Sequence, residues 1–232
     1  MSESVLSLLE KKTIAKDLLE LRFTRPSDFS FRAGQFLQFF IPKEDKNILR
    51  SYSISSTPQD PYLEFCVKLL EDGIASLHFK KMNPAEKISI RGPRGKFTVS
   101  SEPMASYFVA TGAGLAPIMS MIRDELEYKK NKQKIRLLFG LHSEENLFWE
   151  NRLKILAQAH KNFVYDITLS SPKNNENWKG LYGRVTEHFI YPPASQEKQH
   201  YYICGNADMV RDLRTQILTN GGTAEQLHFE IF

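Results

Sequence analysis

The sequence predicts a two-part fold: an N-terminal antiparallel β-barrel followed by a C-terminal α/β domain with a doubly wound parallel sheet. Short apolar segments separated by Gly- and Pro-containing turns fill the first hundred residues, which is typical of small barrels. Apolar strands then alternate with segments of helical periodicity, which is typical of parallel sheets. The polar stretch 100–105 contains Pro103 and divides the two parts. We therefore expect domains at 1–101 and 102–232.

The expected barrel strands are apolar or aromatic segments that end at turn residues. The segment 34–41 is rich in phenylalanine and stops before Pro42. The turn-rich stretches 57–61 and 92–95 each separate two strands. Strands are expected at 18–25, 34–41, 50–55, 62–69, 87–91 and 96–99, and one short helix at 74–79.

The second half begins with a short apolar strand at 107–110 that leads into a glycine turn. Further strands and helices then alternate, as in a doubly wound sheet. Strands are expected at 135–141, 163–169, 201–204 and 227–232, and helices at 116–128, 145–159 and 207–218.

Composition and charge exclude several classes of protein. The formal net charge is +4, and basic and acidic residues are interspersed, so we expect no nucleic-acid partner. No apolar run approaches the roughly 20 residues that span a bilayer, and no secretory signal is recognisable, so we expect a cytoplasmic protein without a membrane partner. Two cysteines, Cys66 and Cys204, are too few for an iron–sulfur cluster. No zinc-ligand spacing is present, and we expect no bound metal.

The glycine turn has the composition of a phosphate-binding site. It reads Thr111-Gly112-Ala113-Gly114-Leu115-Ala116-Pro117 and directly follows the first strand of the alternating half. Glycines let the backbone N–H groups approach a pyrophosphate, and Pro117 suits the first turn of a helix behind it. A tight strand–helix turn that binds nothing has the same glycines, so the turn alone leaves both interpretations open.

Together with the block Arg50-Ser51-Tyr52-Ser53, this turn makes the sequence resemble the ferredoxin–NADP reductase superfamily, over almost its whole length and in the family order. The resemblance implies that the barrel binds FAD and that the second domain binds NADH or NADPH. It implies that Arg50 neutralises the FAD pyrophosphate, that Tyr52 packs on the flavin ring and that Ser53 bonds near flavin N5. Ser51 belongs to the same flavin-binding block.

The remaining cofactor-binding residues also follow from the resemblance. A second flavin segment comprises Val67 and Lys68, and then Gly73, Ile74, Ala75 and Ser76, which open a helix over the FAD diphosphate. Nucleotide-binding residues are expected to be Thr111, Gly112, Gly114, Ala116, Pro117, Ser170, Cys204, Gly205 and Met209. Asn206 stands where the family has proline, which puts the shape of that loop in doubt.

The resemblance assigns catalytic roles to Ser53, Cys204 and Glu230, with Cys204 and Glu230 beside the nicotinamide and Phe232 shielding the flavin. A buried structural thiol and a final core strand are the ordinary alternatives for Cys204 and Phe232. In the nucleotide half, Ser171 stands where several NADP-selective relatives carry arginine, and the loop 178–183 resembles that of NADH-using oxygenase reductases. Both features favour NADH, although Lys173 remains within reach of a 2′-phosphate, and Arg211 and Arg214 lie on the following helix on the nucleotide side.

The expected activity is electron transfer from NADH or NADPH through FAD to a separate acceptor. Because the chain lacks cysteines for its own cluster, a ferredoxin or flavodoxin is the expected partner of a monomer. Two alternatives stay open: a reductase that releases free reduced flavin, and a non-catalytic flavin- or nucleotide-binding module that regulates a partner.

Overall fold

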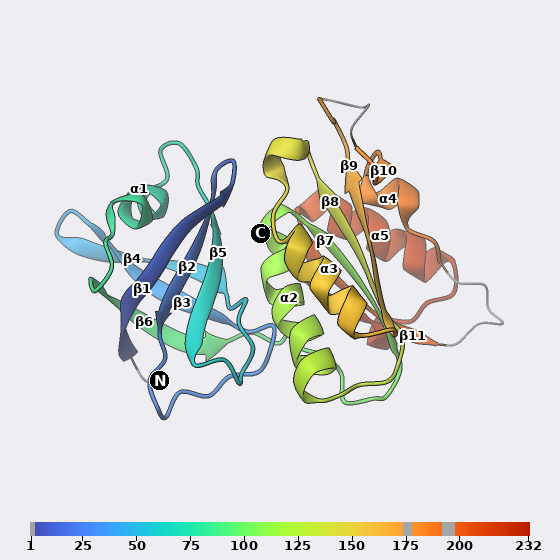
Figure 1. The fold of residues 1–232 in the computed structure, drawn as a ribbon, viewed down its shortest axis with the longest axis horizontal. Coiled ribbons are helices and arrows are strands. Elements are labelled where there is room, and N and C mark those ends of the chain that lie inside the picture. Colours follow the sequence, from blue (N-terminus) through green and yellow to red (C-terminus); the bar gives the residue numbers. More distant parts are fainter. Residues whose placement is uncertain (1–2, 174–177, 192–197) are drawn as a thin grey trace.

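Two sheets lie side by side in the computed structural model, which describes residues 3–173, 178–191 and 198–232 (Figure 1). The N-terminal sheet is antiparallel, with strand order β4-β3-β6-β1-β2-β5. A bridge between Ile54, just after β4, and Phe65 of β5 joins the two outer strands and closes the barrel. The strands are β1 (Glu3–Ala15), β2 (Leu18–Thr24), β3 (Phe36–Lys43), β4 (Lys46–Ser53), β5 (Tyr62–Lys68) and β6 (Lys87–Arg94).

The C-terminal sheet is parallel, with order β10-β9-β8-β7-β11-β12. Because β8 and β11 flank β7 on opposite sides, the strand order reverses beside β7, and ligands bind at the carboxyl ends of strands at such a point. The strands are β7 (Ala105–Thr111), β8 (Ile135–Leu141), β9 (Phe163–Leu169), β10 (Leu181–Tyr182), β11 (Gln199–Gly205) and β12 (Leu227–Ile231). The predicted barrel and doubly wound sheet are thus confirmed.

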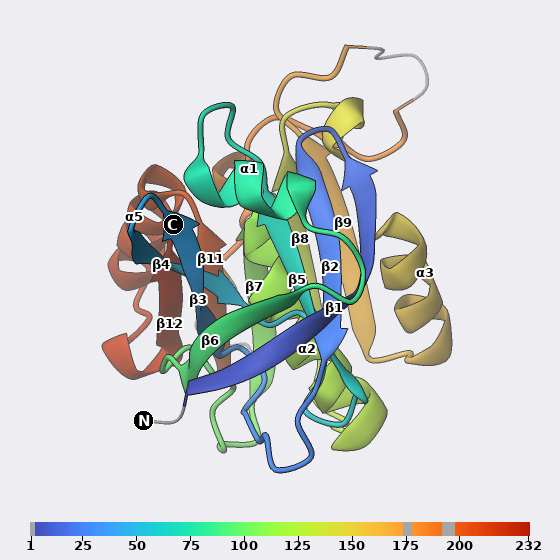
Figure 2. The same cartoon turned by 90° about the vertical axis from the view of Figure 1, so that its left-hand side faces the viewer.

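Helices cover both faces of the parallel sheet and one end of the barrel. The helix α1 (Ile74–Lys81) lies over the barrel end (Figure 2). Two helices, α2 (Leu115–Arg123) and α3 (Glu150–Ala159), lie between the parallel sheet and the barrel, whereas α4 (Val185–His188) and α5 (Ala207–Thr219) cover the far face (Figure 1). Short turns complete the set: η1 (Gly112–Gly114), the π-helical η2 (Asp124–Tyr128), η3 (Glu144–Asn146) and η4 (Ala224–Gln226).

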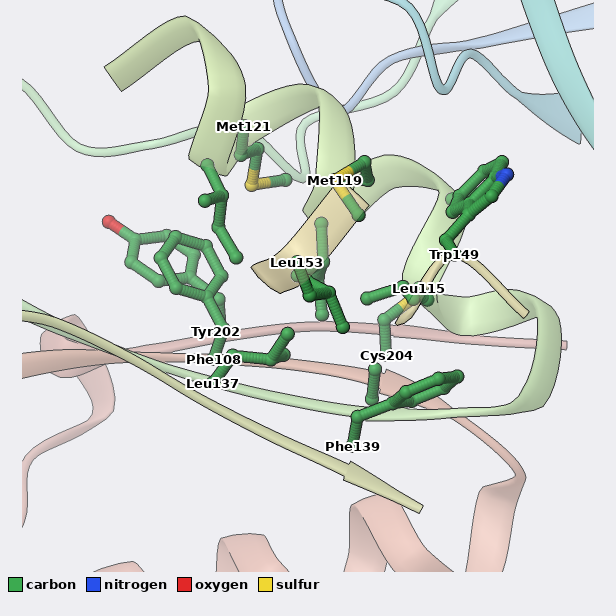
Figure 3. Close-up of a cluster of buried hydrophobic side chains, with 14 of the residues drawn as sticks. Phe108, Leu115, Met119, Met121, Leu137, Phe139, Trp149, Leu153, Tyr202 and Cys204 are labelled. Carbon is green, nitrogen blue, oxygen red and sulfur yellow. The ribbon is translucent and has the colours of Figure 1, made fainter. Parts of the chain in front are cut away.

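An apolar core runs across the boundary between the two sheets. The α2 side chains Leu115, Met119 and Met121 pack with residues of β7, β8 and β11 (Figure 3). The same cluster includes Leu18 and Cys66 of the barrel strands. A continuous buried core of this kind favours a fixed relative position of the two parts, because separating them would expose apolar surface to water.

The structure corrects two expectations about the barrel. The strand expected at 96–99 is wrong: β6 continues through the expected turn to Arg94, and the chain then leaves the sheet. The reason is that Phe97 is buried in the core between the domains, with its carbonyl against Gly34. The strand β1 was not predicted, because Val5 and Leu9 are exposed while Leu6 and Leu8 are buried, so apolar residues lie on both faces and hide the alternation.

Two expected helices are shorter than predicted. The helix expected at 116–128 is α-helical only to Arg123 and continues as the π-helical turn η2. The helix expected at 145–159 begins at Glu150, because Trp149 adopts the left-handed conformation, with a φ of 57°, and directs its indole into the domain interface. No helix among the described residues has the length and apolar character needed to cross a membrane.

Candidate active site

The site is a cleft of about 850 Å³ between the barrel and the carboxyl ends of the parallel strands. Tyr52 and Lys68 line it from the barrel side. Thr111 and Gly112 of the glycine turn line it from the other sheet, together with Ser170, Met209 and Phe232. The cleft therefore brings together sequence-predicted residues from both halves of the chain.

Tyr52 is held in place by aromatic neighbours. Its ring meets those of Phe39 and Phe79 edge-on, with centroids 5.7 and 5.5 Å away. Burial raises the pKa of Tyr52, and the charge of nearby Arg50 lowers it by a smaller amount. The phenol is therefore neutral at physiological pH, and its half-buried ring faces a space where a flavin can stack.

The other residues of the block 50–53 also lie on the edge strand β4. Arg50 and Ser51 are exposed, and among the residues that the structure describes the Arg50 guanidinium donates only to the neighbouring Leu49 carbonyl, at 2.9 Å. Ser53 ends β4 opposite Phe36 and is half-buried. An exposed guanidinium whose single hydrogen bond is local remains available to a phosphate at this end of the barrel.

The second flavin segment divides into core and surface residues. Val67 and Ala75 have their side chains in the barrel core, and Ile74 packs against that core. Lys68 is exposed in the cleft. Gly73 is the N-cap of α1 and supplies no side-chain cap, so the N–H groups of the first turn receive no bond from a capping side chain. Ser76 is buried, and its Oγ accepts from Leu70 N–H at 2.8 Å, which fixes the loop before α1.

A lysine from the missed strand β1 fixes the other end of α1. Lys11 Nζ donates to the carbonyls of Lys80 and Met82, at 2.6 and 2.7 Å, and to that of Phe79 at 3.3 Å. A cation at a helix C-terminus pairs with unsatisfied carbonyls and complements the helix dipole. Lys11 thus fixes the C-terminal end of α1 against β1.

The glycine turn packs tightly on one side and is open on the other. Gly112 has a φ of 52°, and a Cβ there would have no atom within 4 Å. A Cβ on Gly114 would lie 2.2 Å from the Cys204 carbonyl oxygen and 3.0 Å from the Phe232 ring. Ala116 and Pro117 are buried in the first turn of α2. The open side of the turn is therefore the one that faces the cleft.

Cys204 lies at the end of the neighbouring strand β11 and is fully buried. Burial, assisted by the charge of Glu230, raises the pKa of the Cys204 thiol well above its ordinary value, so it stays protonated. A Cβ on Gly205 would lie 2.0 Å from Thr111 Oγ1 and 2.7 Å from the Met209 methyl group. The Cys204-Gly205 backbone thus lies directly against the glycine turn.

Asn206 settles the shape of the loop that its identity had put in doubt. It is the N-cap of α5, and its Oδ1 accepts from Met209 N–H at 2.9 Å. Asparagine is one of the preferred N-cap residues, so it starts the helix by a hydrogen bond where proline would do so by its fixed φ.

The C-terminal residues Glu230 and Phe232 lie beside Cys204 and Gly205. Glu230 lies opposite Cys204 in the β11–β12 register. Its Oε2 is buried with no hydrogen-bond partner among the described residues, and burial raises its pKa. Phe232 N–H donates to the Gly205 carbonyl at 3.2 Å, and the side chain is largely exposed at the cleft. A carboxyl with a raised pKa beside a cleft is a candidate proton donor or acceptor.

Sequence reasoning missed several residues that line the cleft. His142, after β8, lies 3.4 Å from Ser170 Oγ through its Nδ1, and Arg184 follows β10. These positions could have been found from the rule that parallel strands end at one edge of the sheet. Lys16 and Asp17 line the cleft from the β1–β2 hairpin, and no signal indicated them once β1 had been missed.

The comparisons with known proteins agree with this geometry. Residues 5–99 match the family model "Oxidoreductase FAD-binding domain", and residues 108–215 match "Oxidoreductase NAD-binding domain". The chain is 30% identical over 217 residues to ferredoxin–NADP reductase B of Sorangium cellulosum, covering 89% of this chain and 88% of that protein.

Two further relatives show the range of the resemblance. The chain is 27% identical over 245 residues to a component of the Na⁺-translocating NADH-quinone reductase of Actinobacillus pleuropneumoniae, covering 87% of this chain but only 60% of that component. The structure of a ferredoxin NADP⁺ reductase from Neisseria gonorrhoeae with bound FAD and NADP superimposes with a TM-score of 0.85 at 24% identity, covering 100% of this chain and 99% of that one. The chain therefore belongs to the ferredoxin–NADP reductase superfamily and is an FAD- and NAD(P)H-binding flavoprotein oxidoreductase.

Proposed function

We propose that this protein passes electrons from NADH or NADPH through bound FAD to a separate ferredoxin- or flavodoxin-like protein. The observation that carries the proposal is the shared cleft, in which Tyr52 of the barrel, the glycine turn and Phe232 of the second sheet meet. The match over 88% of a ferredoxin–NADP reductase supports the type of acceptor. We further propose that residues 1–101 are the FAD-binding unit and 102–232 the NAD(P)-binding unit.

Bound FAD would supply the redox chemistry, because a flavin accepts a hydride as two electrons and releases them singly. The chain's own residues would bind the FAD and the nicotinamide nucleotide and orient them toward each other. Arg50, Lys68 and the N-terminus of α1 are assigned to the FAD phosphates, and Tyr52 to the flavin ring. Gly112 and its neighbours in the turn are assigned to the nucleotide pyrophosphate, because the turn is open toward the cleft.

Three residues are assigned to the reacting centre. Ser53 would donate a hydrogen bond toward flavin N5. The neutral Cys204 thiol, buried directly behind the glycine turn, would lie near the nicotinamide without competing as a nucleophile. Glu230, whose pKa is raised by burial, is positioned to hold a proton near the flavin.

We also infer that NADH is the preferred donor. Of the basic residues considered for a 2′-phosphate, Lys173 is paired with Glu145 at 2.5 Å, and Arg211 with Asp208 at 2.8 Å. Asp208 and Asp212 line the cleft, and their carboxylates disfavour an additional phosphate. Arg184 lines the cleft as well and is the residue through which NADPH would be accepted.

The acceptor is tested by reducing the holoprotein with one equivalent of NADH without oxygen and then mixing it with oxidised ferredoxin, oxidised flavodoxin or free FMN. We expect the protein acceptors to be reduced at micromolar concentration while FAD stays bound. Release of the flavin on dilution, with turnover only when free flavin is added, would contradict the proposal and favour a flavin reductase.

Replacing Ser53 with alanine is expected to slow flavin reduction by about 10²-fold while leaving FAD content near that of the wild type, because one hydrogen bond to the reacting centre is removed. The comparison variant is Arg50→Ala, which should instead lower FAD retention. Stopped-flow reduction and the flavin-to-protein absorbance ratio measure the two effects. Equal losses of rate and FAD content in Ser53→Ala would make Ser53 merely structural.

A further inference from the structure

The segment that follows Ser53 is unusually buried for a polar stretch. Ser55, Ser56 and Thr57 have no exposed surface, and Asp60 is nearly buried. Some of the hydrogen bonds that these polar groups make come from within the barrel. Ser56 Oγ accepts from Glu64 N–H at 3.1 Å, and Thr57 N–H donates to Asp60 Oδ2 at 2.8 Å. Further bonds come from the other domain.

Helix α2 supplies two of these bonds. The fully buried Ser120 donates through Oγ to the Ser56 carbonyl at 2.5 Å. One helical turn further on, Arg123 donates to the Asp60 carboxylate through both terminal nitrogens, at 2.8 and 3.3 Å. A two-point guanidinium–carboxylate contact fixes orientation as well as distance, and both ends of this one are largely buried.

The same helix carries the nucleotide turn at its other end. Gly114 directly precedes α2, and Ser120 and Arg123 follow it by six and nine residues, or about 9 and 14 Å along a regular helix. Apolar contacts hold the helix against the barrel: the Met121 methyl group packs so closely on Gly34 that a Cβ there would lie 2.3 Å from it. Helix α2 thus links the nucleotide turn to the segment after Ser53 as one rigid piece.

We propose that Ser120 and Arg123 are positioning residues for hydride transfer, which set the distance and angle between the nicotinamide and the flavin. This inference rests on the proposed function. Neither side chain lines the cleft, and each is bonded instead to the barrel segment after Ser53. Their effect is transmitted through Ser56 and Asp60 to Ser53, and reacting atoms displaced by about 1 Å can lose about 10²-fold in rate.

The test uses the FAD-loaded protein with Arg123→Met and Ser120→Ala. Anaerobic stopped-flow mixing with NADH measures the limiting rate of flavin reduction, the half-saturating NADH concentration and the long-wavelength charge-transfer absorbance of the nicotinamide–flavin pair. We expect the limiting rate to fall about tenfold or more and the charge-transfer band to weaken, while half-saturation changes by less than about twofold. Arg123→Lys, which keeps the charge without the fork, should recover part of the rate.

The matched control is Arg136→Met. Arg136 pairs with Asp166 at 3.1 Å, but both residues belong to the parallel sheet and are partly exposed. This variant should reduce its flavin at the wild-type rate. Because Arg123→Met also leaves the Asp60 carboxylate without its charge partner and so lowers stability, Ser120→Ala, which removes only a hydroxyl, provides the second measurement.

Wild-type limiting rates and charge-transfer absorbance in both folded variants would overturn the positioning role and leave the proposed function intact. Failure of the wild-type flavin to be reduced by either NADH or NADPH would overturn the proposed function, and with it this inference.

Discussion

Gly114→Ala is expected to lower the limiting rate of flavin reduction by about 10²-fold. The backbone at Gly114 is helical, so alanine meets no conformational obstacle there. Its Cβ, however, would lie 2.2 Å from the Cys204 carbonyl oxygen and 2.7 Å from the carbonyl carbon. The turn, β11 and the Phe232 ring must therefore separate, and a displacement of about 1 Å at a reacting site is enough for this loss. Anaerobic stopped-flow reduction by NADH measures it.

Gly221→Ala provides the control for this variant. Gly221 follows α5 with a φ of 95°, and a Cβ there would have no atom within 4 Å. Alanine should cost about 1 kcal/mol of stability through backbone strain alone and leave the rate unchanged. A Gly114→Ala protein that reduces its flavin as fast as the wild type would show that the packing of the turn against β11 does not position the nucleotide.

Arg152→Met is expected to lower the free energy of unfolding at pH 7 by about 3–5 kcal/mol. Arg152, on α3, donates to Glu64 at 2.8 and 3.2 Å and to Glu20 at 2.7 Å, and both carboxylates are almost fully buried in the barrel. Methionine leaves the two carboxylates with one shared cation, Arg22, besides the Ser55 hydroxyl at Glu64 and the Trp149 indole at Glu20. Uncompensated buried charge is among the most costly defects in a folded protein. Chemical denaturation measures the change.

The pH dependence of this loss has a definite sign. Burial alone would raise the pKa of Glu64, but the hydrogen bonds and charges of Arg152 and then Arg22 outweigh it, so the pKa is lowered from 4.5. A lowered pKa contributes stability above pH 4.5 that is lost as the pH falls through the folded-state value. The difference between wild type and Arg152→Met should therefore be widest near neutral pH and narrow in acid.

Arg136→Met again provides the control, since Arg136 also stacks over a ring, that of Tyr107 at 5.0 Å, as Arg152 does over Trp149 at 4.7 Å. Its carboxylate partner is partly exposed, so the expected loss is about 1 kcal/mol or less. Equal losses in the two variants, or a loss in Arg152→Met that does not change with pH, would refute the buried-charge account.

The elements that were predicted are those whose own residues show a clear local pattern of apolar, polar and turn residues. The strands β8 and β9 were predicted with both ends correct. Most of β8 is a buried apolar run, and β9 begins with the buried Phe163 and ends with the buried run Ile167–Leu169. The glycine turn was predicted because its backbone requirement limits it to a few residue types. The strand β1 was missed because it carries apolar residues on its exposed face as well as on its buried face, so its sequence does not alternate between apolar and polar residues.

The bonds between the domains left no signal of that kind. Arg152 and Glu20 are 132 positions apart, and Arg123 and Asp60 are 63 apart. As single residues they look like surface charges, because periodicity reports which face of an element is buried and not which distant element covers it. For the same reason the sequence indicated the two halves of the cleft, through Tyr52 and the glycine turn, but neither the hairpin residue Lys16 nor the bonds from α2 to the barrel that join the halves.

The central claim is that this chain holds FAD and that NAD(P)H reduces it in the cleft between the two sheets. The direct measurement is the visible spectrum of the purified protein before and after anaerobic addition of one equivalent of NADH or, separately, NADPH. We predict stoichiometric bound flavin whose absorbance bleaches within the mixing time, faster with NADH. Bound flavin that neither nucleotide reduces would contradict the claim.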